Sequence, residues 1–253
     1  MVTLIKTIKS FKIKKEKPSL LIVGLPGIGF IGRIAVKYLV KQIKAKKFAV
    51  LLSSHFPAQA LMTKKGTLQL LKNEFYYVKT KGVKDIIFLI GDIQPLSHEG
   101  QFEVAMELLS FSKRYNVNEI ITVGGYATGE LEKNLGVFGL SNNPAHISEF
   151  SKLNVKFGKA KGSIVGMVGL LPSLAKYNGV PSAVLLGETH GAFADATSAK
   201  RVLEVLTKYL SIEIDYKTLD KTAKQGKELM KKLQEELEKQ KPKDQSNYPS
   251  YIR

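Results

Sequence analysis

The stretch Leu20–Gly32, LLIVGLPGIGFIG, decides the fold because it runs from a buried strand through a glycine-rich turn into a helix. Gly27, Gly29 and Gly32 have the G-x-G-x-x-G spacing with which dinucleotide-binding folds approach a pyrophosphate. Apolar residues then recur at helical spacing, and Phe48–Leu52 supplies a second apolar strand. The stretch therefore predicts a strand, helix, strand unit.

Further strands and helices alternate along most of the chain. The apolar patterns predict strands over 84–92, 118–124 and 182–187, and helices over 100–115, 170–177 and 195–210. Such alternation is typical of an α/β protein with a mostly parallel sheet covered by helices on both faces. We expect one core domain over residues 1–214, with partner or ligand loops at the carboxyl ends of its strands.

Two less regular regions carry weaker patterns. Residues 1–17 predict an edge strand, and residues 125–161 predict an irregular excursion with one short strand pair. Thr67–Leu71 and Phe75–Thr80 predict a hairpin that turns at Asn73.

The helix over 100–115 is expected to bury one apolar face. That face is formed by Phe102, Ala105, Met106 and Leu109, which recur three or four residues apart.

The C-terminal part has a different pattern of apolar residues. Apolar residues step by three and four in a heptad pattern with Lys and Glu between them, at Leu219, Ala223, Gly226, Met230, Leu233 and Leu237. We expect an amphipathic helix over 215–241 that packs on the domain or on a second copy of the chain, followed by a flexible tail over 242–253. The short seam favours a homo-oligomer.

Composition limits the classes of function. The formal net charge is +17, and the first 50 residues hold twelve Lys or Arg against the single acid Glu16. This charge suits acidic partners, but only four residues in the chain are arginine, so sequence-specific nucleic-acid binding is disfavoured. The absence of cysteine excludes disulfides and thiolate sites and fits a cytoplasmic location, and no apolar run suggests a membrane span.

The glycine motif lacks the partners that a cofactor site needs. A dinucleotide fold places an acid about 20 residues further on, whereas the second strand here ends in Ser53-Ser54. No Gly-Lys-Ser/Thr follows, as a phosphate-binding P-loop would require. We therefore expect no cofactor, and we interpret the glycines as positions where a helix packs tightly on the sheet.

Strand-end residues offer a possible catalytic set. Asp92 and His98 follow one predicted strand, and His190 and Asp195 follow another. A Ser-His-Asp arrangement with Ser53 or Ser54 is conceivable, but no G-x-S-x-G elbow is present. The histidines have no metal-binding spacing, so no metal site is expected and loop residues with structural hydrogen bonds remain the favoured interpretation.

The last residues suggest a docking peptide. Tyr248, Tyr251 and Ile252 lie close to the carboxylate of Arg253, and such an end suits a pocket that offers a lysine to the carboxylate. A tail with no binding role is the alternative.

Several segments together resemble the proteasome-assembly chaperone family of archaea and bacteria. The matching pieces are GLPGIGFIG at 24–32, GDIQPLSHEGQFEVA at 91–105, ITVGGYATG at 121–129, GLLPSLAKYNGVP at 169–181 and LLGETHGAFADATSAKRVLEVL at 185–206. The resemblance implies a nucleoside-phosphorylase-like α/β sandwich without established catalysis, and a homo-oligomer. For some archaeal members it also implies binding to proteasome α subunits through a C-terminal tail.

The tail pattern implied by the resemblance is hydrophobic residue, tyrosine, any residue. This chain ends Tyr251-Ile252-Arg253, so the tyrosine is one position early. We expect a cytoplasmic chaperone that engages α subunits or the α ring through Tyr248 and these last three residues. Whether the shifted tyrosine docks, how many subunits assemble and which proteasome surface is bound stay open. The runner-up is an enzyme for a nucleoside or phosphate compound that uses Asp92, His98, His190 and Asp195.

Overall fold

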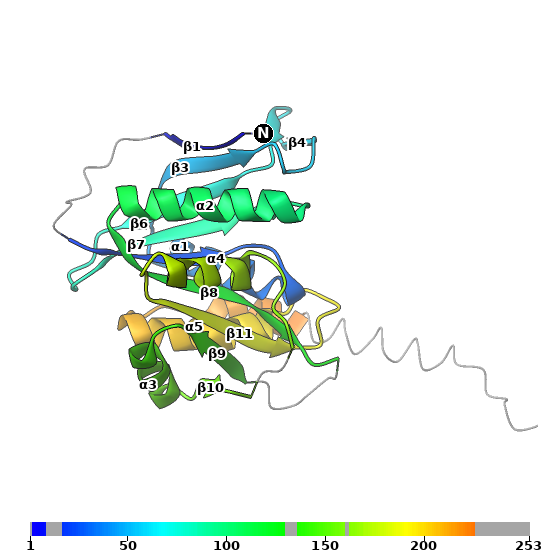
Figure 1. Ribbon diagram of the computed structural model, residues 1–253. Helices are drawn as coiled ribbons and strands as arrows, with labels where there is room; N and C mark the ends of the chain where they lie inside the picture. The colour runs from blue at the N-terminus through cyan, green and yellow to red at the C-terminus, as the bar shows by residue number, and fades with distance from the viewer. Residues whose placement is uncertain (1, 9–16, 130–135, 160–161, 226–253) are drawn as a thin grey trace, which may run out of the picture.

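The structure of the chain is a computed structural model that describes residues 2–8, 17–129, 136–159 and 162–225 (Figure 1). Among these residues a nine-stranded sheet forms the middle layer, in the order β1-β3-β6-β7-β2-β8-β11-β9-β10. The strands of this sheet are β1 (Thr3–Thr7), β2 (Ser19–Gly24), β3 (Lys46–Ser53), β6 (Asn73–Val78), β7 (Asp85–Gly91), β8 (Val117–Ala127), β9 (Val137–Ser141), β10 (Lys156–Phe157) and β11 (Ser182–Thr189). β4 (Ala60–Met62) and β5 (Leu68–Leu70) pair in a separate two-stranded sheet.

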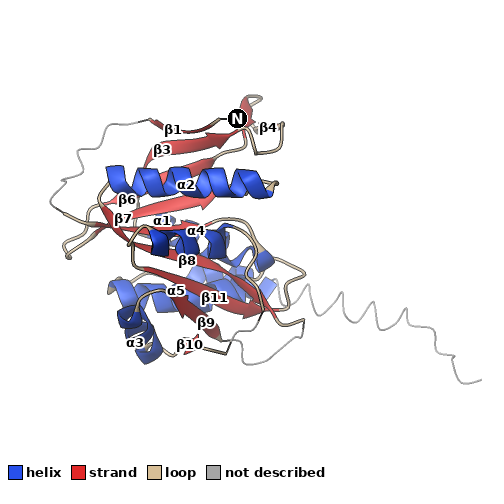
Figure 2. Cartoon of the chain, viewed as in Figure 1, coloured by secondary structure: helices blue, strands red, loops and turns tan. Residues whose placement is uncertain are grey.

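Helices cover both faces of the nine-stranded sheet. α2 (His98–Arg114) and α4 (Met167–Tyr177) lie side by side on one face, and α1 (Ile31–Gln42) and α5 (Ala196–Leu210) lie on the other (Figures 1 and 2). The short helix η1 (Ile28–Phe30) precedes α1, and α3 (Pro144–Lys152) packs beside β9 and β10. Each face has its own apolar core cluster. The expected α/β fold class is confirmed.

The centre of the sheet is parallel and its outer parts are mixed. β7, β2, β8 and β11 run parallel, and every residue of β2, β7 and β11 is buried. Strands covered on both faces read as continuous apolar runs, which is the pattern of these segments. β1, β3 and β6 pair antiparallel on one side, and β9 pairs antiparallel with β11 on the other. The expected edge strand near the N-terminus is confirmed as β1.

The predicted hairpin of Thr67–Leu71 with Phe75–Thr80 is wrong. β5 pairs with β4, whereas β6 lies between β3 and β7 in the large sheet. Asn73 is not a turn residue, because it is buried at the start of β6. Alternation marks both segments as strands, but it does not specify which strand each one pairs with.

The predicted apolar face of α2 is only half correct. Ala105 and Leu109 are buried, whereas Phe102 and Met106 are about half exposed. The helix carries more apolar residues than one face can hold, and the buried stripe is completed by Val104, Leu108 and Phe111.

The excursion after β8 contains a strand pair, as expected, and also a helix that was not predicted. β9 and β10 pair in parallel, and α3 lies between them in sequence. Asn143 caps α3 by accepting a hydrogen bond from the amide of Ala145 at 2.9 Å, and Pro144 is the first helical residue. Asn followed by Pro is a typical helix start, so this signal was present in the sequence.

The beginning of the expected C-terminal helix packs on the domain. Residues 217–225 are helical, and Leu219 is buried in the core cluster beneath α1 and α5. The Tyr38 hydroxyl donates to the carbonyl of Asp215 at 2.7 Å, and Lys200 pairs with Asp220 at 2.6 Å. Ala223 packs against the same cluster, and the seam residues from Gly226 onward and the tail lie outside the described residues. In the described part of the chain, no helix has both the length and the apolar character needed to cross a bilayer.

Candidate functional site

The glycine motif joins β2, α1 and β8 at close range. A Cβ atom added to Gly32 would lie 2.1 Å from the carbonyl oxygen of Val123, so only glycine lets α1 approach β8 this closely. Gly29 has a positive φ of 61°. The amide of Phe30 donates to the carbonyl of Gly27 at 2.9 Å, so this amide is already used within the loop. The motif therefore serves helix-to-sheet packing in this structure.

A pocket of about 360 Å³ opens beside this loop, and we call it the strand-end pocket. It is formed by the carboxyl ends of β2, β8 and β11, the following loops and the first turn of α4. The chain leaves β2 through α1 toward β3, whereas it leaves β8 toward β9 and β11 on the other side of the sheet. Neighbouring parallel strands whose connections diverge in this way define the switch point where α/β proteins bind ligands.

Within the described ranges, the lining of the strand-end pocket has no ionisable group apart from the phenol of Tyr126. The remaining polar side chains are those of Gln94, Thr122 and Ser163. None of the four residues of the predicted catalytic set belongs to the lining. The usual ligand position of the fold is therefore occupied by a mostly apolar pocket.

Asp92 and His98 lie apart from that pocket. Asp92 forms an ion pair with Arg33 at 3.0 Å at the end of β7. His98 is exposed and begins α2, where it lines a second and larger groove. The two residues follow the same strand but belong to different surfaces.

Asp195 is a structural cap. It accepts hydrogen bonds from the amide of Ser198 at 2.9 Å and from the hydroxyl of Thr189 at 2.8 Å, and so begins α5. His190 lies nearby in sequence, and its Nδ1 atom is buried with no hydrogen-bond partner among the described residues. β7 and β11 are separated by β2 and β8, a span of roughly 14 Å, so Asp92 is not brought to His190.

The conceivable Ser-His-Asp arrangement is not assembled. Ser53 ends β3, and four strands separate β3 from β11, which is a span of roughly 24 Å. The hydroxyl of Ser53 instead contacts that of Thr3 at 2.9 Å, and the hydroxyl of Ser54 accepts from the amide of Val2 at 3.1 Å. Within the described ranges there is also no cluster of three or more His, Asp or Glu that could hold a metal ion.

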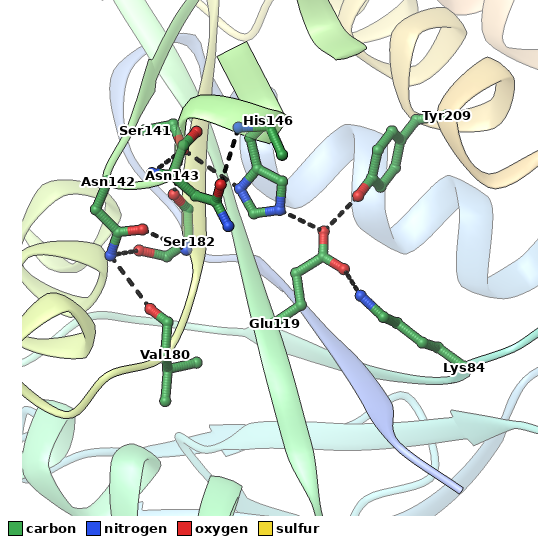
Figure 3. A network of polar contacts seen from close by, with 10 residues as sticks. Lys84, Glu119, Ser141, Asn142, Asn143, His146, Val180, Ser182 and Tyr209 are labelled. Atoms are coloured by element: carbon green, nitrogen blue, oxygen red, sulfur yellow. Dashed lines mark hydrogen bonds and ion pairs between the residues drawn. The ribbon is translucent and has the colours of Figure 1, made fainter. Parts of the chain in front are cut away.

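A buried polar network lies at the amino ends of the parallel strands, opposite the strand-end pocket, where β8 begins (Figure 3). Glu119 is 1% exposed and accepts hydrogen bonds from Lys84, from His146 Nε2 at 3.1 Å and from the Tyr209 hydroxyl at 2.5 Å. Burial alone would raise the pKa of Glu119, but hydrogen bonds from His146, Lys84 and Tyr209 outweigh burial and lower it to about 2. Because the network joins β8 to α3 and α5, we interpret it as a structural contact that holds these three elements together.

An open groove of about 820 Å³ runs between α2, α4 and β9. We call it the α2–α4 groove. Phe102, Val165 and Tyr177 line it, and Tyr177 is 87% exposed. The sequence assigned Phe102 to the core, so the exposed apolar character of this groove was not predicted. Exposed apolar surface around a groove is typical of protein-binding sites.

A second apolar surface is formed by β4 and β5. Ala60 lies opposite Leu70, and Met62 lies opposite Leu68, so these four side chains share one face of the small sheet. Met62 is 89% exposed and Leu68 is 78% exposed. We call this surface the β4–β5 face.

A basic surface follows the exposed side of α1. Arg33, Lys37, Lys41 and Lys44 line a cleft of about 520 Å³ together with the end of β7. Arg33 is paired with Asp92, whereas the three lysines are exposed. Four of the twelve basic residues among the first 50 therefore lie along α1 or just after it.

The expected partner-binding residues Tyr248, Tyr251, Ile252 and Arg253 lie outside the described residues. Their role in partner binding therefore remains a prediction from the sequence.

The structure thus combines an α/β fold with helices on both faces of the sheet and two exposed apolar surfaces. The chain matches the PAC2 family model over residues 21–234, and it belongs to the PAC2 family. It is 37% identical over 232 residues to an uncharacterized protein of Methanocaldococcus jannaschii, with 89% of each chain covered. The resemblance noted from the sequence motifs is confirmed.

Two solved structures from Pyrococcus furiosus are similar over nearly their whole length. PbaB, an archaeal proteasome activator, is 38% identical with a TM-score of 0.85, and the match covers 92% of this chain and 98% of PbaB. PbaA, an archaeal homolog of proteasome-assembly chaperone, is 29% identical with a TM-score of 0.75, and the match covers 93% of each chain. The relatives therefore connect this fold with the proteasome.

Proposed function

We propose that this chain is a cytoplasmic, archaeal proteasome-binding protein that engages α subunits or the α ring and assists assembly or activation. The observation that carries the proposal is the similarity to PbaB and PbaA over more than nine-tenths of the chain. The function is binding, and no catalytic step belongs to it.

The C-terminal segment is the proposed contact with the α ring. The helix that begins at residue 217 is fixed to the domain by buried Leu219, so the chain beyond it starts from a defined place. Tyr251, Ile252 and the carboxylate of Arg253 supply an aromatic group, an apolar group and a negative charge. A pocket between α subunits that offers a lysine would bind such an end.

A homo-oligomer is the second part of the proposal. An isolated two-stranded sheet has marginal stability in water, and the β4–β5 face leaves Met62 and Leu68 almost fully exposed. A partner that covers this face would stabilise it, and a second copy of the chain is the partner that we propose. Several copies would present several tails to a ring of α subunits, which raises the overall affinity.

Removal of the tail tests its role. We expect that deleting residues 248–253 abolishes retention of the α ring by the immobilised chain and leaves the thermal unfolding midpoint unchanged. Val83→Ala is the matched control, since Val83 is an exposed residue of the α/β domain and is far from the tail in sequence.

Full retention after the deletion would exclude the tail as the contact. The variants Phe102→Ala and Tyr177→Ala then test the α2–α4 groove, because both side chains line it and are exposed.

A further inference from the structure

We propose that the strand-end pocket binds a small uncharged apolar molecule with one or two rings. The proposal concerns a ligand site in the domain and does not depend on any contact with the proteasome.

The position of the pocket is the first argument. It lies between the carboxyl ends of β2 and β8, whose connections leave in opposite directions. The divergence of two connections leaves a crevice that no helix fills, which is why ligands of α/β proteins gather at such points. The pocket thus follows from the topology and not from a chance gap between side chains.

The size of the pocket limits the ligand. Ligand pockets span about 300–1,000 Å³, and this one is near the lower bound with about 360 Å³. An apolar cavity of about 150 Å³ binds benzene. The strand-end pocket therefore has room for a molecule with two fused rings.

The walls are fixed by internal hydrogen bonds. Gln94 accepts from the amide of Met167 at 2.9 Å and donates to the carbonyl of Pro26. The Thr122 hydroxyl donates to the carbonyl of Val168 at 2.7 Å. Because both polar side chains already have partners within the protein, they hold α4 against the strand ends and do not depend on a ligand for hydrogen bonds.

The chemistry of the described lining disfavours an anion. Among the residues that the structure describes, the lining has no Lys, Arg or His, although the chain as a whole carries a formal charge of +17. A phosphate placed there would lose its hydration without gaining an opposite charge. The apolar walls, among them Leu25, Val168 and Leu186, instead gain free energy when they exclude water around an uncharged ring.

The mouth of the pocket is accessible. Ile28 is 47% exposed on one side, and Val165 is largely exposed on the other. A small molecule can therefore enter without unfolding the domain.

Indole is a suitable probe because the chain has no tryptophan. Indole fluorescence excited beyond the tyrosine absorption band then reports on the ligand alone. We expect the emission of indole to shift to the blue on titration with the full chain, and the thermal unfolding midpoint to rise with indole concentration. Toluene should compete with indole, whereas inorganic phosphate and adenosine monophosphate should not.

Filling the pocket provides the critical variant. Val168→Phe adds volume inside the lining and should weaken indole binding at least tenfold, and Ile164→Phe is a second filling variant if the first does not fold. Val83→Phe is the matched control, because Val83 is exposed and does not belong to the lining. Its affinity for indole should equal that of the unaltered chain.

The proposal is overturned if neither indole nor toluene binds the unaltered chain, or if a folded filling variant binds indole with unchanged affinity. Competition by adenosine monophosphate would equally overturn it, since that result would indicate a site for phosphate compounds. None of these outcomes depends on whether the chain retains α subunits.

Discussion

Glu119 shows how one buried residue can join distant parts of the chain. Its carboxylate receives hydrogen bonds from Tyr209, which is 90 residues away in sequence, and from Lys84, which is 35 residues away. A carboxylate buried this deeply is costly unless charged and hydrogen-bonding groups surround it. The network therefore contributes to stability only while Glu119 is ionised.

The stability of the protein should fall in acid for this reason. The pKa of Glu119 is lowered to about 2 in the folded chain, below its ordinary value of 4.5. The contribution is fully present above pH 4.5 and is lost as the pH falls toward 2. Glu119→Gln should lower the free energy of unfolding at neutral pH by about 3 kcal/mol, and this difference should shrink across that acidic range.

Chemical denaturation at a series of pH values measures the effect. Glu107→Gln is the matched control, because Glu107 forms a partly exposed pair with Arg114 at 2.9 Å, and surface pairs contribute about 1 kcal/mol or less. A pH-independent loss in Glu119→Gln would contradict the role of the carboxylate charge.

Single residues differ in how far the sequence reveals them. Gly32 was predicted as a packing position because strand, turn and helix are contiguous there. The structure agrees with this prediction, since an added Cβ would lie 2.1 Å from the carbonyl oxygen of Val123. Asp195 was favoured as a loop residue with structural hydrogen bonds, and it caps α5. The partnership of Glu119 with His146 was not predicted, because no local pattern connects a strand residue with a residue on a later helix.

At the scale of elements, β4 and β5 stand out because they form a sheet with only two strands. Three strands or a covering helix are usually needed for independent stability. The exposed β4–β5 face is the element for which the proposed second copy of the chain is most needed.

Charges on this face should weaken the assembly. We expect Met62→Asp combined with Leu68→Asp to lower the molecular mass in solution to that of a single chain, because a shared interface would have to bury two carboxylates. Light scattering after size-exclusion chromatography measures the mass. Val83→Asp places one carboxylate on a similarly exposed side chain away from β4 and β5, and it should leave the mass unchanged.

An unaltered mass in the double variant would show that copies meet through another surface. A single-chain mass for the unaltered protein would contradict the homo-oligomer itself.

Elements were predictable where local patterns are strong. Continuous apolar runs identified β2, β7 and β11, since strands buried on both faces need no alternation. Pairing was not predictable for β5 and β6, because the partner of a strand depends on the whole sheet. The exposed face of α2 was also missed, because apolar residues that serve a surface look the same in sequence as those that serve a core.

At the scale of the whole molecule, the sheet separates two kinds of surface. The α2–α4 groove lies on one face of the sheet, and basic α1 with the start of the C-terminal helix lies on the other. A partner with an acidic surface would be attracted to α1, and this attraction should weaken as salt rises. The fold class was accessible from the sequence because alternating strands and helices allow few arrangements.

Binding to proteasome α subunits is the central claim, and a pull-down with the unaltered chain tests it most directly. The immobilised full chain is incubated separately with purified α subunits and purified β subunits of an archaeal proteasome, and the retained protein is quantified at near-physiological salt. We predict that α subunits are retained and that β subunits are not. Equal retention of both, or retention of neither, would contradict the account.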